Sequence, residues 1–341
     1  MSQVKAQSAN SSRILRCISL LYIVVTWLLV LQLMVIHRIL LTPYYTNTKQ
    51  VELTIPYGTS GKQVAEILHK NNIIEDEDAF VLFTNIINHS TTTNHTIKAG
   101  RYSFQQGTSL IDAWQKMIRG DELLYNVTIP EGKTIAQTIS ILSNLPSIDI
   151  SLINSIHLND GDILPDTYHY RHNEPVGNII TQMREEITSF IMVEWESRDV
   201  KIDQYIKTPE EAIILASIVE SESMIDEERP MVAGVYINRL KAKMPLQACP
   251  TVIYAITDKQ QSSGRTLSIS DLQYKSPYNT YIHRGLPPGA ICNPGRASII
   301  AVLHPVWHDK LYFVADNNNH HILSRTFKEH KLAIKQIRSR K

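Results

Sequence analysis

Two glutamates two positions apart, Glu220 and Glu222, are the residues of this sequence best suited to proton transfer. They lie near the end of the segment 208–225, TPEEAIILASIVESESMI. Thr208 followed by Glu211 predicts a capping box, in which each of these two side chains binds a backbone N–H at the start of a helix. We therefore expect a helix that begins at residue 208, and this start fixes the register of its side chains.

The helical register places Glu222 among apolar side chains. At about 100° per residue it lies in the middle of one apolar face, formed by Leu215, Ile218, Val219 and Ile225. A carboxyl group there needs either a partner or a raised pKa, and a raised pKa suits a general acid at neutral pH. The alternative is a structural glutamate that pairs with an arginine such as Arg239 or with backbone amides. Glu220 falls roughly 160° away and is a second candidate if the helix is enclosed.

Other common chemistries have no support in the sequence. It contains no G-x-S-x-G, H-E-x-x-H, P-loop or G-x-G-x-x-G motif. His304 and His308 do not predict a metal site, because Pro305 disrupts the helix that would present them together. Three cysteines without a Cys-x-x-Cys pair make neither a disulfide scaffold nor a zinc motif. The formal net charge of +1, from 34 basic and 33 acidic residues, disfavours a nucleic acid partner.

The N-terminal region predicts a single transmembrane helix. Residues 17–36, CISLLYIVVTWLLVLQLMVI, carry no charge, and a helix of that length matches a hydrocarbon core of about 30 Å. No small residues mark a cleavage site after this segment, so we expect residues 17–41 to form an uncleaved anchor rather than a signal peptide. Basic residues in the tail 1–16 favour a cytoplasmic N-terminus, so the rest of the chain would face outward.

The remaining sequence predicts an α+β protein with long loops. Alternating apolar residues predict strands, and apolar residues at helical spacing predict helices. Between the anchor and residue 125 we expect strands at 51–55 and 99–104, with helices at 60–70, 77–87 and 110–118, and a polar loop at 88–96. Beyond residue 130 we expect helices at 134–145, 176–195, 208–225, 230–243, 296–303 and 327–341, a strand at 311–315, and irregular loops at 244–294. Long loops of that kind are often functional.

Several ordered motifs resemble the endolytic murein transglycosylase family, the YceG-like proteins. The motifs are LASIVESES, VAGVYINRL, MPLQACPTVIYAI, SPYNTY, GLPPGAICNPGRAS and YFVAD, with KAGRYSF and GDILPDTYHY upstream. The resemblance implies an anchor, a small LysM-like domain at 50–125 and a mainly helical catalytic domain at 130–341. The pair Glu222-Ser223 is similar to the Glu-Ser pair that carries the catalytic acid in soluble lytic transglycosylases. Both arguments favour Glu222 as the catalytic residue, with Glu220 as a supporting or alternative acid.

The resemblance implies cleavage of peptidoglycan glycan strands at the bacterial plasma membrane. Such an enzyme cleaves the MurNAc–GlcNAc bond of nascent strands, forms 1,6-anhydro-MurNAc ends, and needs one carboxyl group and no cofactor. Its catalytic domain would be periplasmic, and peptidoglycan synthases are candidate partners. Gln247, Asn279 and Tyr281 carry amide and phenol groups suited to sugar hydroxyls and are candidate substrate contacts. Two alternatives are a catalytically idle glycan-binding or division scaffold, and a muramidase hydrolase with a second acid.

Two cysteines depart from the pattern of that family. Cys249 stands where the family usually has the aspartate of Gln-x-Asp-Pro-Thr, and Cys292 lies in the other loop expected near the cleft. Since disulfides persist outside the cytoplasm, a Cys249–Cys292 bridge is a hypothesis that the structure can test.

Overall fold

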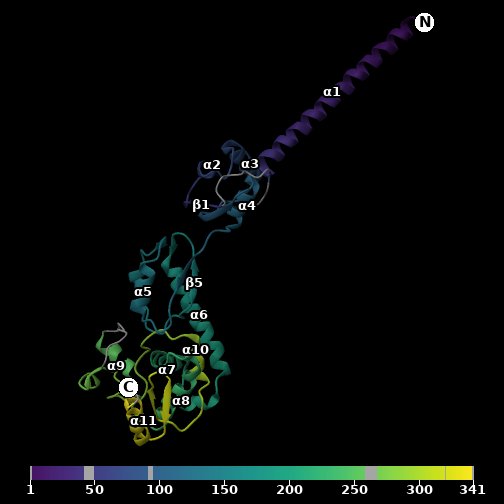
Figure 1. The fold of residues 1–341 in the computed structure, drawn as a ribbon. Helices are drawn as coiled ribbons and strands as arrows, with labels where there is room; N and C mark the ends of the chain where they lie inside the picture. The colour runs from purple at the N-terminus through teal and green to yellow at the C-terminus, as the bar shows by residue number, and fades with distance from the viewer. Residues whose placement is uncertain (1, 42–49, 91–94, 258–266, 319, 340–341) are drawn as a thin grey trace. The chain divides into compact units, whose positions relative to one another are not determined.

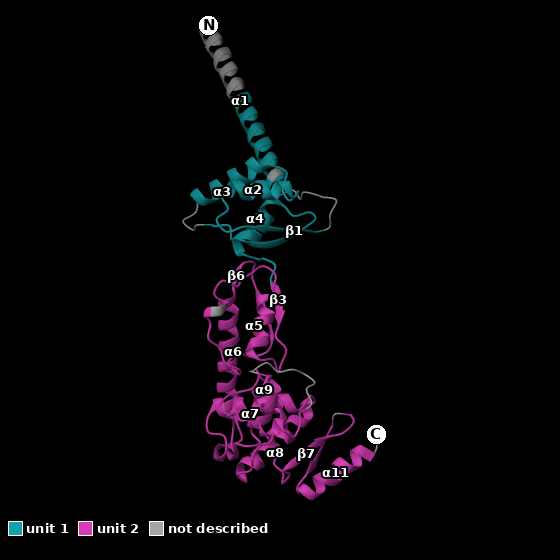
Figure 2. Cartoon of the chain, turned by 90° about the vertical axis from the view of Figure 1, so that its left-hand side faces the viewer, with its two compact units in different colours: residues 1–124 teal, residues 125–341 magenta. Residues whose placement is uncertain are grey.

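The fold was analysed in a computed structural model, which describes residues 2–41, 50–90, 95–257, 267–318 and 320–339. The chain divides into two compact units, Met1–Leu124 and Tyr125–Lys341 (Figures 1 and 2). Helices and strands are mixed throughout, as the sequence predicts. The sequence also predicts a short polar joint at 46–49, between the anchor and the first strand; it lies outside the described residues.

The N-terminal helix α1, Ser2–Leu41, contains the predicted apolar segment. Its stretch Ser19–Arg38 has a mean hydropathy of 2.4 over 20 residues and is not buried against the rest of the protein. Large apolar side chains there are exposed, among them Leu21 and Trp27. By length and composition this helix can cross a bilayer.

The rest of the first unit packs three helices against a two-stranded sheet. Strand β1, Gln50–Ile55, pairs antiparallel with β2, Gly100–Gln105. The helices are α2 (Gly61–Lys70), α3 (Glu77–Ser90) and α4 (Leu110–Arg119), and capping boxes fix the starts of α2 and α4. The core contains Val64, Leu68, Phe80, Tyr102, Phe104 and Met117. The polar loop was predicted to begin at residue 88, but α3 continues to Ser90. Residues 91–94 of this loop lie outside the described part.

The second unit begins with two short sheets and two helices. Strand β3, Tyr125–Thr128, pairs antiparallel with β5, Thr167–Tyr170. Strand β4, Ile148–Asp149, pairs parallel with β6, Glu174–Pro175. Strands β4, β5 and β6 were not predicted; β4 and β6 have two residues each, too few to show the alternation that predicts a strand. Helices α5 (Ile135–Ser143) and α6 (Val176–Ser197) share a hydrophobic core with β3 and β5.

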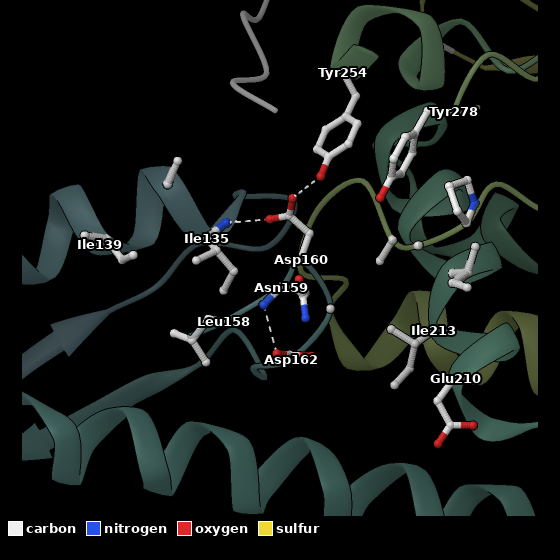
Figure 3. A pocket seen from close by; sticks show the side chains of 16 residues that line it. Ile135, Ile139, Leu158, Asn159, Asp160, Asp162, Glu210, Ile213, Tyr254 and Tyr278 are labelled. Atoms are coloured by element: carbon white, nitrogen blue, oxygen red, sulfur yellow. Dashed lines mark hydrogen bonds between the residues drawn. The ribbon is translucent and has the colours of Figure 1, made fainter. Parts of the chain in front are cut away.

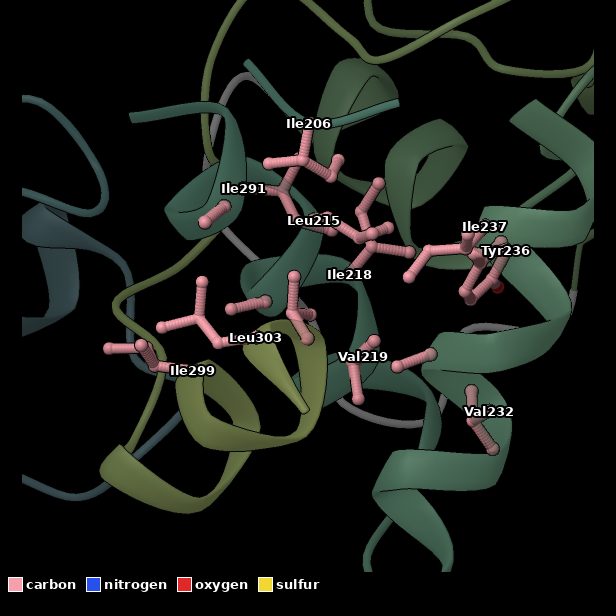
Figure 4. Close-up of a cluster of buried hydrophobic side chains, with 14 of the residues drawn as sticks. Ile206, Leu215, Ile218, Val219, Val232, Tyr236, Ile237, Ile291, Ile299 and Leu303 are labelled. Atoms are coloured by element: carbon pink, nitrogen blue, oxygen red, sulfur yellow. The ribbon is translucent and has the colours of Figure 1, made fainter. Parts of the chain in front are cut away.

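A cluster of four helices forms the centre of the second unit. They are α7 (Pro209–Glu222), α8 (Arg229–Lys241), α9 (Cys249–Ile256) and α10 (Arg296–Leu303). Buried residues of α7, α8 and α10 interlock in one core (Figure 4). Gly234 lets α8 approach the chain at residue 306 closely, because a Cβ there would lie 2.4 Å from the Val306 carbonyl oxygen. Strands β7 (Tyr312–Ala315) and β8 (His321–Ser324) pair antiparallel, and α11 (Phe327–Ser339) follows them.

Two predictions in this region are wrong. Helix α7 ends at Glu222 rather than at Ile225, because Ser223 adopts an extended conformation as its C-cap. The region predicted as irregular, 244–294, contains helix α9, which is short and begins with Cys249-Pro250 in a proline-rich context.

Candidate active site

The last turn of α7 presents both candidate glutamates. The helix starts as predicted, with the Thr208 hydroxyl accepting a hydrogen bond from the Glu211 N–H at 3.2 Å. The second half of the predicted capping box differs, because the Glu211 carboxylate accepts from the N–H of Lys207 instead. At the other end, the Ser223 N–H donates to the Val219 carbonyl and closes the final turn. Glu222 is thus the last residue of the helix and projects from its end.

Glu222 has hydrogen-bond donors around a carboxyl group that packing removes from water. The Tyr236 hydroxyl donates to Glu222 Oε1 at 3.1 Å, and the backbone N–H of Cys249 also donates to the carboxyl group. Burial raises the pKa of Glu222 to about 7, although these donors and the nearby cation Arg239 favour the charged form. The residue as a whole keeps partial contact with solvent. Glu222 can therefore hold a proton near neutral pH and still be reached by a substrate.

Arg239, the example of a partner for a structural Glu222, binds backbone carbonyls instead. Its guanidinium donates to the Leu311 oxygen at 2.7 Å and to the Leu246 oxygen at 2.6 Å. Its positive charge lowers the pKa of Glu222 without forming an ion pair with it. The Tyr236 phenol, which does bind Glu222, is 1% exposed and packs edge-on against the Phe313 ring. The carboxyl group is thus held by a rigid neutral donor.

Glu220 is tied into an ion pair and accepts three donors. Its carboxylate lies 3.1 Å from the Arg229 guanidinium, and both side chains are only 6% exposed. Glu220 Oε2 also accepts from the Gly295 N–H at 3.0 Å and from the Ser298 hydroxyl at 2.8 Å. A Cβ at Gly295 would lie 1.9 Å from Glu131 Oε1, so a larger side chain there would displace the Glu131 carboxylate. Glu220 connects α7 to α8 and α10.

Tyr281 lies beside Glu222, whereas Asn279 is used inside its own loop. The Tyr281 hydroxyl is 3.1 Å from the Cys249 sulfur. Burial raises the pKa of both groups, and the charge of Glu222 adds to the increase. The fully buried Asn279 side chain donates to the carbonyls of Leu272 and Tyr274. This amide shapes the loop and has little capacity left for a sugar.

Gln247, the remaining predicted substrate contact, is exposed. Its backbone N–H donates to the Thr280 carbonyl at 3.1 Å, and its φ of 50° lies in the left-handed region. This backbone conformation turns the chain into α9 and thereby sets the position of the Cys249 N–H.

The hypothesis of a Cys249–Cys292 disulfide is wrong. Both cysteines are free, with Cys249 exposed and Cys292 buried. The Cys292 sulfur lies 3.3 Å from the Ser217 carbonyl and 3.6 Å from the Ser221 hydroxyl on α7. The two thiols therefore have separate surroundings, and Cys292 is part of the packing of α7.

Tyr236 and Arg229 are the residues of this site that sequence reasoning missed. Both lie on α8, inside or just before the motif VAGVYINRL, and both are almost fully buried polar side chains. A buried polar residue signals a partner, but the sequence does not say which. Among the residues that the structure describes, no group of three or more His, Cys, Asp and Glu side chains is placed to hold a metal ion.

Comparisons with known proteins agree on one family. A family model described as the YceG-like family matches residues 53–336. An endolytic murein transglycosylase of Bacillus subtilis is 31% identical, over 86% of this chain and 87% of its own length. One from Streptococcus pneumoniae is 26% identical over 81% of this chain, which spans only 56% of that relative. The crystal structure of a YceG-like protein from Listeria monocytogenes has a TM-score of 0.53 and 27% identity, and covers 83% of this chain and 98% of that one. The chain belongs to the YceG-like family.

Proposed function

We propose that this chain is an endolytic murein transglycosylase, a lyase that cleaves the MurNAc–GlcNAc bond of nascent peptidoglycan strands and leaves 1,6-anhydro-MurNAc ends. The single observation that carries the proposal is the environment of Glu222, a desolvated carboxyl group with a pKa of about 7 at an accessible helix end. The names of the relatives from Bacillus subtilis and Streptococcus pneumoniae support the same activity.

The first step uses the protonated form of Glu222. Its proton goes to the oxygen of the glycosidic bond as that bond to C1 of MurNAc breaks, and the leaving sugar departs as an alcohol. A general acid with a pKa near the working pH is half protonated there and still a good donor. Burial is the main cause of this raised pKa.

The second step returns the proton to Glu222. The C6 hydroxyl of the same MurNAc residue attacks C1, its oxygen forms the anhydro bridge, and its proton goes to the Glu222 carboxylate. The Tyr236 hydroxyl and the Cys249 N–H stabilise the negative charge between the two steps. Since the nucleophile belongs to the substrate, its effective concentration is high, and the step needs neither a second carboxyl group nor a water molecule.

A muramidase hydrolase is the alternative that needs a second carboxylate near Glu222. Among the described residues, the charged neighbour with a marked effect on the pKa of Glu222 is the cation Arg239. This observation favours the transglycosylase. Product mass separates the alternatives, because hydrolysis leaves reducing ends, transglycosylation leaves anhydro ends, and an idle scaffold leaves the glycan intact.

The decisive experiment compares Glu222→Gln with Glu220→Gln. Glutamine keeps the shape of the side chain and cannot transfer the proton, so Glu222→Gln should lower activity on uncrosslinked strands by about 10² to 10⁴. Glu220→Gln weakens an ion pair and should retain the chemistry in whatever fraction remains folded. Anhydro-muropeptides are counted by mass spectrometry, and thermal melting confirms folding. A folded Glu222→Gln protein with the wild-type rate would refute the assignment.

We also propose that α1 is a single-pass anchor with a cytoplasmic N-terminus, that residues 50–125 form a LysM-like domain, and that residues 130–341 form the catalytic domain outside the plasma membrane. The apolar stretch Ser19–Arg38 and the separate core of the first unit support this arrangement. Peptidoglycan synthases are candidate partners at the membrane. Alkaline phosphatase joined after Tyr45 should be active, and a cytoplasmic reporter that is active there instead would reverse the topology.

A further inference from the structure

The second unit contains a cavity that Glu222 does not line. It has a volume of about 590 Å³ and lies between α5, the loop 158–162, the first turns of α7 and the loop 278–290 (Figure 3). Its walls are partly polar and partly apolar. Ile139 and Leu158 line one side, and Ile213 lines the other.

Two tyrosines and an aspartate make a fixed wall of this cavity. The rings of Tyr254 and Tyr278 lie 4.9 Å apart at an angle of 53°. The Tyr254 hydroxyl donates to Asp160 Oδ2 at 2.5 Å, and Asp160 Oδ1 accepts from the Ile135 N–H at the start of α5 at 2.6 Å (Figure 3). Because Asp160 fixes the Tyr254 hydroxyl and the Tyr254 ring packs against Tyr278, the wall is preorganised for a ligand.

The charges of the cavity select against an anionic ligand. Asp160, Asp162 and Glu210 contribute carboxylates, and none of the described residues that line the cavity is Lys or Arg. Carboxylates accept hydrogen bonds from hydroxyl groups, while aromatic rings and isoleucines cover apolar faces. A neutral ligand with many hydroxyl groups and apolar patches fits this lining. An N-acetylated sugar ring has both features, whereas the carboxylates of a stem peptide would be repelled.

Two helices join the cavity to the candidate active site. Helix α9 begins at Cys249, whose N–H binds Glu222, and Tyr254 lies about 7.5 Å further along it. On α7, Glu210 at the cavity and Glu222 at the other end are about 18 Å apart along the helix. A strand of several linked sugars spans this distance.

We propose that this cavity is a remote glycan-binding subsite, which holds an N-acetylated sugar of the strand several residues from the bond that Glu222 breaks. The inference rests on the proposed function for the identity of the polymer. The cavity supplies binding energy away from the reacting atoms, and it sets a minimum length of strand that binds well. It takes no part in proton transfer.

The test measures binding without turnover. The probe is chitotetraose, titrated into the full chain in detergent with Glu222→Gln in place, and observed by ligand-detected NMR. Ala136→Trp fills the cavity from an exposed position of α5, and Tyr278→Ala removes one ring of the wall. Each should weaken binding by about tenfold or more. Tyr274→Ala is the matched control, because Tyr274 is 46% exposed and does not line the cavity.

The outcomes separate this inference from the proposed function. Unchanged chitotetraose binding in a folded Ala136→Trp protein overturns the subsite, whatever the catalytic activity. Tighter binding of a free stem tripeptide than of chitotetraose, lost in the same variant, also overturns it and assigns the cavity to the peptide. With Glu222 intact, Ala136→Trp should raise KM for glycan strands and leave kcat and the anhydro product unchanged. If the wild type forms no anhydro product, the proposed function is refuted, while the binding result for the cavity still stands.

Discussion

Tyr236→Phe should move the pH dependence of cleavage to higher pH. The Tyr236 hydroxyl donates to Glu222 Oε1 at 3.1 Å and stabilises its charged form. Phenylalanine keeps the ring that packs against Phe313 and removes only that donor. Because the carboxylate loses stabilisation, the pKa of Glu222 rises above its present value of about 7. The general acid then keeps its proton at pH values where the wild type has lost it.

The size of the change follows from the strength of the hydrogen bond. A hydrogen bond to a charged group contributes about 1.5–3 kcal/mol, and 1.36 kcal/mol corresponds to a tenfold change in an ionisation constant. The alkaline limb of kcat/KM, which lies near pH 7 in the wild type, should therefore move up by about one to two pH units. At pH 8 the protonated fraction of Glu222 would rise by about five- to tenfold.

The assay measures kcat/KM for anhydro-muropeptide release between pH 5 and pH 9. The position of the limb is the readout, because a loss of positioning lowers the whole profile without moving it. Tyr168→Phe is the matched control: Tyr168 is equally buried, and its hydroxyl donates to the Leu164 carbonyl instead. An alkaline limb that stays in place in Tyr236→Phe, or moves to lower pH, would refute the assignment of this ionisation to Glu222.

Three further outcomes are expected. Arg229→Met leaves a buried carboxylate without its cation and should lower the free energy of unfolding by about 3–5 kcal/mol in urea denaturation; a loss below 1 kcal/mol contradicts the structural role of the ion pair. The folded pKa of Glu222 lies above its usual value of 4.5, so the free energy of unfolding falls as pH rises from about 4.5 to 7. Glu222→Gln should remove this fall. Thermal melts should then show the variant more stable than the wild type by about 3 kcal/mol above pH 7, and equally stable at pH 4.5. In a Cys17→Ser background, iodoacetamide should label Cys249 and spare Cys292 in the folded protein, and equal labelling of both would contradict their different burial.

Local sequence signals predicted the bounds of some helices well. Helix α10 has the predicted bounds, since Gly295 precedes it and Pro305 follows it closely. The end of α7 was misplaced because Met224 and Ile225 continue the apolar pattern, and apolar periodicity does not report the extended backbone at Ser223.

Helix α9 was missed because its signal is tertiary. It lies between loops rich in proline, which favour an irregular structure, and no side chain caps its start. Its position comes from contacts with a distant loop: the Ala248 N–H donates to the Thr280 hydroxyl at 3.0 Å, and the Thr251 hydroxyl lies 2.9 Å from the same group. Such a contact depends on how the loops fold together, which no local pattern records.

The two glutamates show what periodicity reports and what it does not. It placed both on a helix and put Glu222 on an apolar face, but their chemical difference comes from other elements. Glu220 meets Arg229 in a pair of nearly buried charges, so its charge is compensated. Glu222 meets a neutral phenol and a backbone N–H, which bind a carboxylate without supplying a full compensating charge. Burial therefore raises the pKa of Glu222 to about 7, where a carboxyl group can both give and take a proton. Partners supplied by α8 and α9 thus make one glutamate a candidate acid, while those from α8 and α10 make the other a structural anchor.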